Sequence, residues 1–235
     1  MNALKCVNPY QNLTIENVDG VDIKVSTFED AISYVVKPNH DKNYISEAVL
    51  KELKKNRDYK EWQKQLPTTR IPNIFWKYKN RYSKQEPNAH QILNDVDLEI
   101  KKCGIYLPVG QQLCHGGVWW ERNNNFAITT YPLSLTFSPT IALRLLNRGK
   151  YCGDRVDLFF MTIKEEGIRA FPYPLTCEHR IETEVLIQSG IKLNLVNDTL
   201  VRTDFKIGVK DPEIACNYID KDCELHIVEF DVTKG

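Results

Sequence analysis

Two glutamates stand two residues apart in the stretch RIETEVLIQSG, which runs from Arg180 to Gly190. The apolar residues after them are typical of a buried β-strand, and side chains two apart on a strand point to the same face. We therefore expect Glu182 and Glu184 to lie side by side. Like charges at that spacing repel, and the repulsion is stronger in an enclosed site. An exposed strand end tolerates such a pair without any function, whereas an enclosed pair implies that the carboxylates do chemistry together.

A histidine and two glycines form a second stretch, LCHGG, from Leu113 to Gly117. Paired glycines let a ligand approach the backbone closely and expose main-chain N–H and C=O groups to it. His115 and Gly116 are therefore candidate ligand-binding residues at the end of an expected strand. Taken alone, the stretch also fits an ordinary turn with a hydrogen-bonded histidine.

Two hydroxyl side chains mark a third stretch, PLSLTFSPTIALRL, from Pro132 to Leu145. Ser134 and Thr136 share one face of an expected strand that runs directly into a helix. Hydroxyls at that spacing can bond a ligand or hold a carboxylate in place. The ordinary β propensity of Thr, with a Ser near a strand end, explains the same residues without a function.

Length and composition limit the classes of protein to which this chain can belong. The 235 residues suffice for one large domain or two small ones with a buried core. Lys plus Arg total 31 and Asp plus Glu total 31, so the formal net charge is zero. The chain as a whole therefore has no electrostatic attraction to nucleic acid or anionic lipid. With no N-terminal signal and no apolar segment of membrane length, we expect a cytoplasmic protein without a membrane partner. Seven scattered cysteines without a CxxC pair indicate reduced thiols rather than disulfides or a zinc site.

Residues 1–103 are predicted to be mainly helical, after a short strand in VDIKV. Apolar residues recur at helical spacing in FEDAISYVV, in NYISEAVLKELKKNRDYKEWQKQL and in HQILNDVDLEIKKCG. The stretch IFWKYKNRY, from Ile74 to Tyr82, mixes aromatic and basic residues. It suits a helix with a solvated basic face, and it also suits a surface for nucleic acid or an adenine ring.

Residues 104–235 are predicted to be rich in strands separated by turns. The expected strands are GQQLCHGGVW, NFAITTYPLSLTF, VDLFFMTIK, ETEVLIQSG, IKLNLVND and ELHIVEFDV. Between the second and third, SPTIALRLLNRG predicts a short helix with Ser138 as N-cap, Pro139 at the first helical position and Gly149 just past its end. A helical part followed by a β-rich part predicts an α+β fold.

The order of the three stretches resembles the ADP-ribosyltransferase family, in particular its toxin-like mono-ADP-ribosyltransferase branch. That branch is marked by Arg, then Ser-x-Ser/Thr, then Glu-x-Glu, and this chain has His-Gly, Ser-x-Thr and Glu-x-Glu in that order. The resemblance runs from Ile105 to Val196. It implies a split β-sheet core in residues 104–235 that binds NAD. The helical residues 1–103 lie outside the resemblance, and we expect them to pack on that core and to cover or complete the NAD cleft.

The resemblance also implies roles for single residues. Glu184 matches the catalytic glutamate, which grips the 2′-hydroxyl of the nicotinamide ribose and stabilises the oxocarbenium-like transition state. Glu182 matches the glutamate that positions or deprotonates the acceptor. Ser134 matches the serine that orients the catalytic glutamate and approaches the ribose. Thr136 is the second hydroxyl of that motif, and Phe137 is expected to wall the nicotinamide pocket.

His115 departs from the toxin-like branch, which has Arg at this place to hold the NAD phosphates or ribose. The poly-ADP-ribose polymerase and diphtheria-toxin branch has His-Gly instead, with the His on the adenosine ribose and the Gly backbone on the nicotinamide amide, which here would be Gly116. The exchange removes a bidentate phosphate contact. Phosphate binding then needs other residues, for which Arg122, Arg144 and Arg148 are candidates.

The segment GIRAFPYPLTCEHRIE, from Gly167 to Glu182, contains two prolines and no clean periodicity, which predicts a rigid irregular loop. In the family, the loop before Glu-x-Glu touches the acceptor, so the resemblance makes Tyr173 and Arg180 candidates for acceptor recognition. A purely structural loop explains the same two residues. His179 is not expected to act as a base.

Together these stretches predict a mono-ADP-ribosyltransferase that cleaves NAD and passes ADP-ribose to a macromolecule. No metal is expected, because the nicotinamide ring is already a pyridinium cation that leaves as a neutral molecule. In family terms Glu-x-Glu favours protein arginine as the acceptor; a nucleic-acid base, water (an NAD glycohydrolase) and an inactive nucleotide- or partner-binding module are the alternatives. By analogy, such an enzyme suits an intracellular toxin or effector, for example from a toxin–antitoxin system, with an inhibitor or antitoxin protein as partner.

Overall fold

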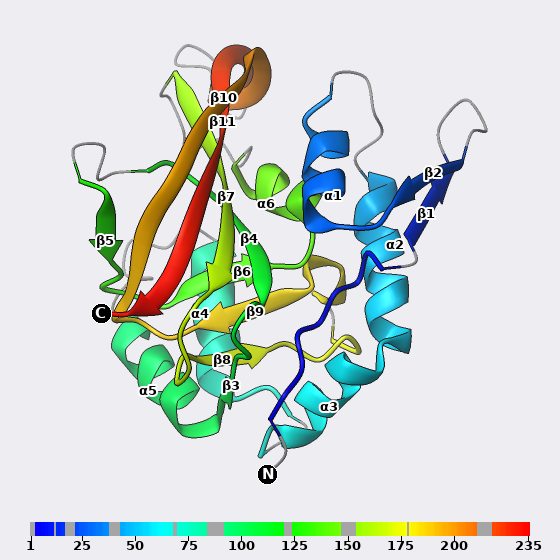
Figure 1. Cartoon of the computed structure of the whole chain (residues 1–235). Coiled ribbons are helices and arrows are strands. Elements are labelled where there is room, and N and C mark those ends of the chain that lie inside the picture. The colour runs from blue at the N-terminus through cyan, green and yellow to red at the C-terminus, as the bar shows by residue number, and fades with distance from the viewer. Residues whose placement is uncertain are drawn as a thin grey trace.

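The computed structural model describes residues 3–11, 13–16, 22–37, 43–67, 70–83, 92–119, 124–146, 154–177, 179–210 and 218–235. Helices dominate the first part of the chain and strands the second (Figure 1). The α+β class predicted from the sequence is therefore confirmed.

The helical part carries a small two-stranded antiparallel sheet in addition to its helices. The stretch from Asn43 to Leu66 is helical, as the sequence predicts, but it is divided into two helices at Asn56. Asn56 has an extended backbone and caps a new helix, because its side chain accepts a hydrogen bond from the Tyr59 N–H at 2.8 Å. The elements are β1 (Leu13–Glu16), β2 (Asp22–Val25), α1 (Phe28–Val35), α2 (Asn43–Lys55), α3 (Arg57–Gln65), α4 (Asn73–Ser83) and α5 (Leu93–Cys103).

Within the described residues, nine strands of the second part form one mixed sheet. Their bounds are β3 (Ile105–Tyr106), β4 (Gln112–Gly117), β5 (Phe126–Ile128), β6 (Leu133–Thr136), β7 (Arg155–Ile163), β8 (Arg169–Pro172), β9 (Glu184–Ile187), β10 (Ile191–Lys210) and β11 (Tyr218–Lys234). The order across the sheet is β3-β8-β9-β6-β4-β7-β11-β10-β5. Helix α6 (Pro139–Leu146) follows β6, and Ser138 caps it with a side-chain contact to the Ile141 N–H at 3.4 Å.

The sheet divides between β4 and β6. These two strands pair at one position only, Cys114 with Thr136. By contrast, β4 pairs with β7 at six positions and β6 pairs with β9 at four. The side of β4 that faces away from β7 therefore loses its partner strand at His115 and Gly116. This is the split that the family resemblance implies for the sheet.

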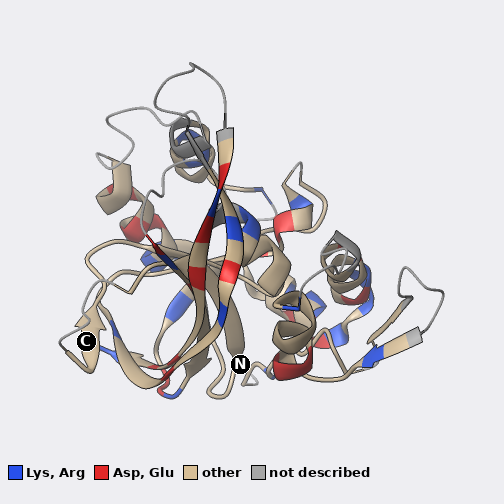
Figure 2. Cartoon of the chain, turned by 90° about the horizontal axis from the view of Figure 1, so that it is seen from above, with Lys and Arg blue, Asp and Glu red and all other residues tan. Residues whose placement is uncertain are grey.

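The last two strands are much longer than the sequence predicts. β10 and β11 span 20 and 17 residues and form a hairpin that rises beyond the rest of the sheet (Figure 1). In its outer part the buried Phe205 and Ile207 flank the exposed Lys206, whose ammonium group forms a cross-strand ion pair with Asp222 at 2.9 Å. Lys and Arg are interspersed with Asp and Glu over the described ribbon (Figure 2). The expected irregular loop before Glu182 is also corrected in part, because β8 lies within it.

One hydrophobic core runs through both parts of the chain. Tyr59 and Trp62 of α3 lie against Phe137, with ring centroids 5.8 and 6.0 Å from it. Phe75 of α4 packs on Phe171 of β8, with ring centroids 4.8 Å apart. Burying a Phe side chain is worth about 1.5–3 kcal/mol. These contacts hold α3 and α4 against the sheet that carries the candidate site.

The described cysteines are free thiols. Within the described ranges, no group of three or more His, Cys, Asp or Glu side chains is placed to hold a metal ion. No helix in the part of the chain that the structure describes is both long and apolar enough to cross a bilayer.

Candidate active site

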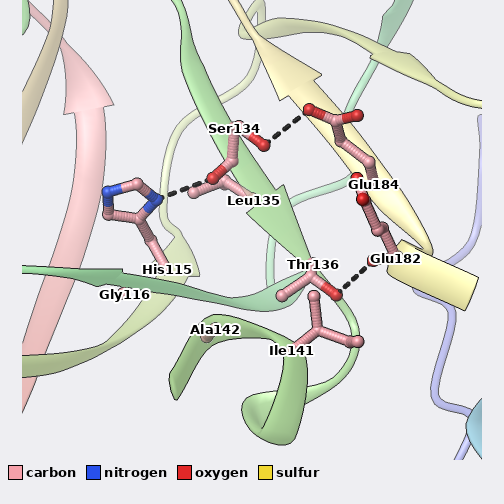
Figure 3. Close-up of a pocket in the computed structure, with 9 residues that line it drawn as sticks. All are labelled: His115, Gly116, Ser134, Leu135, Thr136, Ile141, Ala142, Glu182 and Glu184. Atoms are coloured by element: carbon pink, nitrogen blue, oxygen red, sulfur yellow. Dashed lines mark hydrogen bonds between the residues drawn. The ribbon is translucent and has the colours of Figure 1, made fainter. Parts of the chain in front are cut away.

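A pocket lies where β4 and β6 separate (Figure 3). It is formed by residues of β4, β6 and α6 and by the segment that leads into β9. Its lining residues are His115, Gly116, Ser134, Leu135, Thr136, Ile141, Ala142, Glu182 and Glu184. All three stretches that carry the sequence motifs thus contribute to one opening.

Ser134 lies in the middle of this pocket and bonds to residues on both sides (Figure 3). Its backbone C=O accepts a hydrogen bond from His115 Nδ1 at 2.7 Å. Its hydroxyl donates to Glu184 Oε1 at 2.6 Å. Because β6 is the strand between β4 and β9, one residue can connect the histidine of one strand to the glutamate of the other.

Glu184 is the first residue of β9 and pairs with Thr136 across the ladder. The residue is only 8% exposed. A buried carboxylate is unfavourable unless its charge is paired and its oxygens are hydrogen-bonded. Here Oε1 accepts the Ser134 hydroxyl, and Oε2 lies 2.7 Å from Lys79 Nζ. The carboxylate is therefore held at both oxygens while it lines the pocket.

Glu182 reaches the pocket by a different route from the one predicted. It does not share a strand with Glu184 but ends a 3₁₀ turn, Arg180–Glu182. Thr183 between them has a left-handed backbone, with φ 43° and ψ 43°, which is uncommon for a residue other than glycine. Thr136 Oγ1 fixes the turn by donating to the Glu182 C=O at 2.7 Å. The expected side-by-side placement by strand alternation is thus wrong, although both carboxylates line the pocket.

Lys79 of α4 joins the two carboxylates; it lies in the basic-aromatic stretch from Ile74 to Tyr82 and outside the three stretches that carry the family motifs. Its Nζ lies 2.7 Å from Glu182 Oε2 and 2.7 Å from Glu184 Oε2. Burial alone would lower the pKa of Lys79, but the negative charges of Glu184 and Glu182 outweigh it and raise the pKa above the usual lysine value. The ammonium group is therefore charged throughout the physiological pH range.

A weak signal for Lys79 is present in the sequence of α4. Phe75 and Lys79 are one helical turn apart, so they share a face of the helix. Phe75 is fully buried against Phe171. A lysine on the buried face of a helix needs an anionic partner, because an unpaired buried charge is very unfavourable.

His115 is bound through its ring at Nδ1, and Nδ1 carries the proton because a backbone carbonyl can only accept. Burial lowers the pKa of His115, with the bond to Ser134 opposing that shift. The ring is therefore neutral near neutral pH, and Nε2 presents a lone pair. Such a group accepts a hydrogen bond from a hydroxyl or amide, but it does not neutralise a phosphate.

The structure places Phe137 and Tyr173 in the core rather than at the expected positions. Phe137 is fully buried and does not line the pocket, because the chain turns inward after Thr136 and packs the ring on α3. Tyr173 is 4% exposed, and its ring centroid is 5.0 Å from Lys79 Nζ. A side chain so buried contacts Lys79 and offers no surface to a macromolecular acceptor.

The remaining candidates lie around the rim of the site or away from it. Arg180 is exposed at the start of the 3₁₀ turn, where an acceptor could reach it. His179 Nδ1 is 3.5 Å from Glu182 Oε1, and the His179 ring is 5.9 Å from that of Trp76. Arg144 is exposed on α6. The other two candidates for phosphate binding, Arg122 and Arg148, lie outside the described residues.

The pocket combines a hydrogen-bond acceptor, His115 Nε2, with an oriented anion, the Glu184 carboxylate. Glu184 retains acceptor capacity, because each carboxylate oxygen has two lone-pair positions. A fixed carboxylate in a partly enclosed site can bind a substrate hydroxyl and stabilise positive charge that develops next to it. Glu182, held beside it by Lys79, offers a second carboxylate for a proton or for an acceptor group.

The chain is similar in structure to ADP-ribosyltransferase toxins. The ADP-ribosyltransferase Vis in complex with agmatine gives a TM-score of 0.49 at 12% identity, covering 88% of this chain and 91% of that one. Another structure of Vis, a toxin from Vibrio splendidus, gives a TM-score of 0.47 at 13% identity over 87% of this chain and 91% of that one. For C3larvin, an ADP-ribosyltransferase toxin from Paenibacillus larvae, the TM-score is 0.38 at 12% identity, with coverage of 76% and 94%. No family model and no curated protein matches the chain.

Proposed function

We propose that this protein is a mono-ADP-ribosyltransferase that cleaves the bond between nicotinamide and ribose in NAD and transfers ADP-ribose to a macromolecular acceptor. The observation that carries the proposal is the hydrogen bond of 2.6 Å from Ser134 Oγ to Glu184 Oε1 at the split of the sheet. It gives the two residues the relation that the resemblance implies, a serine that orients a catalytic glutamate. NAD is the substrate, and the reaction needs no metal.

The proposed reaction begins with the 2′-hydroxyl of the nicotinamide ribose donating a hydrogen bond to Glu184. The bond from the anomeric carbon to the nicotinamide nitrogen breaks, and its electron pair stays on the nitrogen, so nicotinamide leaves neutral. The positive charge that develops on the ribose lies near the Glu184 carboxylate, which stabilises it. A nucleophilic atom of the acceptor then bonds to the anomeric carbon, and its proton passes to Glu182 or to solvent.

His115 and Gly116 would bind NAD at the other end of the pocket. The neutral His115 ring can accept a ribose hydroxyl through Nε2, and the Gly116 backbone can bond the nicotinamide amide. His115 cannot replace the arginine of the toxin-like branch as a phosphate ligand, since a neutral ring carries no compensating charge. Phosphate contacts would then come from other cations, of which Arg144 is a described candidate.

Protein arginine is the acceptor that we favour, because Glu182 and Glu184 together match the Glu-x-Glu pair. An exposed arginine of a target protein would approach past Arg180 on the rim. A carboxylate at Glu182 suits a guanidinium both as a charge partner and as a base for the proton that it loses.

A nucleic-acid base is the second candidate acceptor, and the position of Trp76 favours it. Trp76 is partly exposed on α4, and its ring lies 5.9 Å from that of His179, next to Glu182. An aromatic ring beside the rim of the site could stack on a base. The expected basic-aromatic helix thus lies at the site and not on a remote surface.

The acceptor is identified by incubating the protein with cell extract and NAD labelled on its adenylate half. Label in a protease-sensitive band supports a protein acceptor, and label lost on nuclease treatment supports a nucleic-acid acceptor. Release of nicotinamide without a labelled macromolecule indicates an NAD glycohydrolase. No NAD consumption by the folded wild-type protein would overturn the proposal and leave the binding-module alternative.

A role as an intracellular toxin or effector is proposed from the resemblance alone, together with an inhibitor or antitoxin partner. Such a protein should arrest growth when it is expressed in a sensitive cell, and Glu184→Gln should remove the arrest. If both proteins arrest growth equally at equal abundance, the toxic effect does not come from this site.

A further inference from the structure

Lys79 is the one cation described within ion-pair distance of both site carboxylates. The side chains of Lys79, Glu182 and Glu184 are 12%, 15% and 10% exposed. Both contacts measure 2.7 Å. Lys79 comes from the helical part of the chain, 105 residues before Glu184, and no motif of the sheet includes it.

The position of Lys79 is set by the core, because its helix is anchored there. Phe75, on the same face of α4, packs on Phe171 and Tyr173, with ring centroids 4.8 and 6.2 Å away. The Tyr173 ring in turn lies 5.0 Å from Lys79 Nζ. The ammonium group is therefore held in place by packing as well as by charge, unlike a lysine on a solvated surface.

The two glutamates need such a partner for physical reasons. Two carboxylates in a partly enclosed site repel, and one of them takes up a proton unless a cation compensates. Glu182 has the greater need, because it ends a 3₁₀ turn and no strand ladder places it beside Glu184. One ammonium between the two oxygens supplies both the attraction that brings them together and the compensating charge.

We propose that Lys79 is a positioning residue of this site, which holds the Glu182 carboxylate beside Glu184 and supplies a compensating charge to both carboxylates. This inference rests on the proposed function for its effect on catalysis, but the contact itself is independent of it. It also gives the helical part of the chain a defined task in the site.

Several titratable groups face Lys79 and enter any dependence on pH. From the 3₁₀ turn and β9 come Glu182 and Glu184, and from the segment after β8 come the Tyr173 ring and the Cys177 thiol. His179 contacts Glu182 from the outer side, with Nδ1 3.5 Å from Oε1. Burial raises the pKa of Cys177 and of Tyr173, so both are neutral near neutral pH and leave the two glutamates as the counter-charges.

The test compares Lys79→Met, Lys79→Arg and Lys77→Met in nicotinamide release from NAD as a function of pH. Lys79→Met should move the acidic limb of the profile to higher pH by about one to two units. At a pH on the acidic limb of the wild-type profile, this shift lowers nicotinamide release about 10- to 100-fold. Lys79→Arg keeps a cation between the oxygens and should restore the position of the limb. Lys77 is exposed on the same helix, and Lys77→Met should match the wild type.

A lost contact that merely loosened the fold would lower activity without moving the limb, and circular dichroism would report the loosening. A folded Lys79→Met variant with the wild-type profile would overturn the inference. So would a Lys79→Arg variant that behaves like Lys79→Met while its fold is intact.

A second measurement keeps this inference separate from the proposed function. NMR titration of the Lys79 side chain needs no NAD, and the pKa of Lys79 should lie above the usual lysine value. Glu182→Gln should lower it towards that value. An ordinary Lys79 pKa that Glu182→Gln leaves unchanged overturns the inference, whatever the activity. A raised pKa in a wild-type protein that fails to cleave NAD overturns the proposed function and leaves the contact standing.

Discussion

The two ends of the pocket differ in charge, although both are bound to Ser134. At one end the neutral His115 ring donates to the Ser134 carbonyl at 2.7 Å. At the other end, the Glu184 carboxylate accepts a hydrogen bond from the Ser134 hydroxyl at 2.6 Å and forms an ion pair with the Lys79 ammonium at 2.7 Å. A neutral end can bind a ligand by hydrogen bonds, whereas a fixed charge can also stabilise a charged transition state. For the proposed reaction, binding and chemistry are therefore separable in this pocket.

Glu184→Gln should have the largest effect, because it removes the charge from the charged end. Nicotinamide release should fall by about 10²–10³-fold, the range found when a fixed electrostatic contact to a transition state is lost. NAD affinity should change little, because the neutral end is intact. The rates come from nicotinamide release and the affinity from calorimetry. Glu47→Gln, at an exposed position on α2, is the matched control.

Glu182→Gln should separate the roles of the two glutamates, because the proposed role of Glu182 concerns the acceptor only. Transfer of ADP-ribose should be lost while release of nicotinamide to water persists. Equal losses of both activities in Glu182→Gln would contradict separate roles for the two glutamates.

Ser134→Ala should have the next largest effect, because it changes one end and spares the other. It removes the hydroxyl that orients Glu184, and it keeps the backbone carbonyl that accepts from His115. A hydrogen bond to a charged group is worth about 1.5–3 kcal/mol, so kcat should fall about 10- to 100-fold. KM should stay near the wild-type value, and Ser33→Ala, exposed on α1, is the control. A change in KM alone would assign Ser134 to binding and not to orientation.

His115→Ala should affect binding and spare the chemistry. The Kd for NAD should rise about 3- to 10-fold, as expected for one neutral hydrogen bond, with kcat close to that of the wild type. Calorimetry gives the Kd, and nicotinamide release at saturating NAD gives kcat. A large loss of kcat at unchanged Kd would contradict the division between the two ends.

The pKa of His115, lowered by burial, predicts how NAD affinity depends on pH. The neutral ring is the form that accepts the hydrogen bond, so affinity should stay constant as pH falls to the usual histidine value of about 6.5. It should weaken only below the lowered pKa. Stability has the same sign: because the folded pKa lies below the unfolded one, the neutral ring's contribution is present above the unfolded value and lost as pH falls through the folded value. The binding effect should be absent from His115→Ala.

Thr136→Val should have the smallest effect on activity, because the Thr136 hydroxyl bonds neither the His115 ring nor the Glu184 carboxylate. It removes the bond of 2.7 Å to the Glu182 C=O and the contact of 3.0 Å to Thr183 Oγ1. The free energy of unfolding should fall by about 1–2 kcal/mol, with nicotinamide release changed only slightly. Denaturant unfolding measures the first quantity, and Thr14→Val, exposed on β1, is the control. A loss of activity as large as that of Ser134→Ala would mean that the turn itself is part of the catalytic machinery.

The parts of the site that depend on local patterns could be predicted from the sequence. Strand periodicity indicates β6 and β9, and the family resemblance implies that Ser134 lies beside Glu184. The capping pattern of Ser138 and Pro139 predicts the start of α6 correctly. Each of these features depends only on residues that are close in the chain or on the pairing of two strands.

The parts that depend on distant contacts or rare backbone conformations could not be predicted. Lys79 reaches Glu184 only because Phe75 anchors α4 in the core, and no motif encodes that packing. Glu182 depends on the left-handed backbone of Thr183, which threonine does not favour and therefore does not signal. The break between α2 and α3 could not be predicted, because apolar residues keep the helical spacing on both sides of Asn56. Asn is a favoured N-cap residue, but the sequence does not indicate that this Asn begins a new helix.

The most direct test of the central claim is whether the purified wild-type protein releases nicotinamide from NAD, with folded Glu184→Gln measured beside it. The account predicts release by the wild type and almost none by the variant. A folded wild-type protein that leaves NAD intact would contradict it, because Ser134, Glu184 and Lys79 would then form a buried polar network without this chemistry. Equal release by both proteins would place the chemistry away from Glu184.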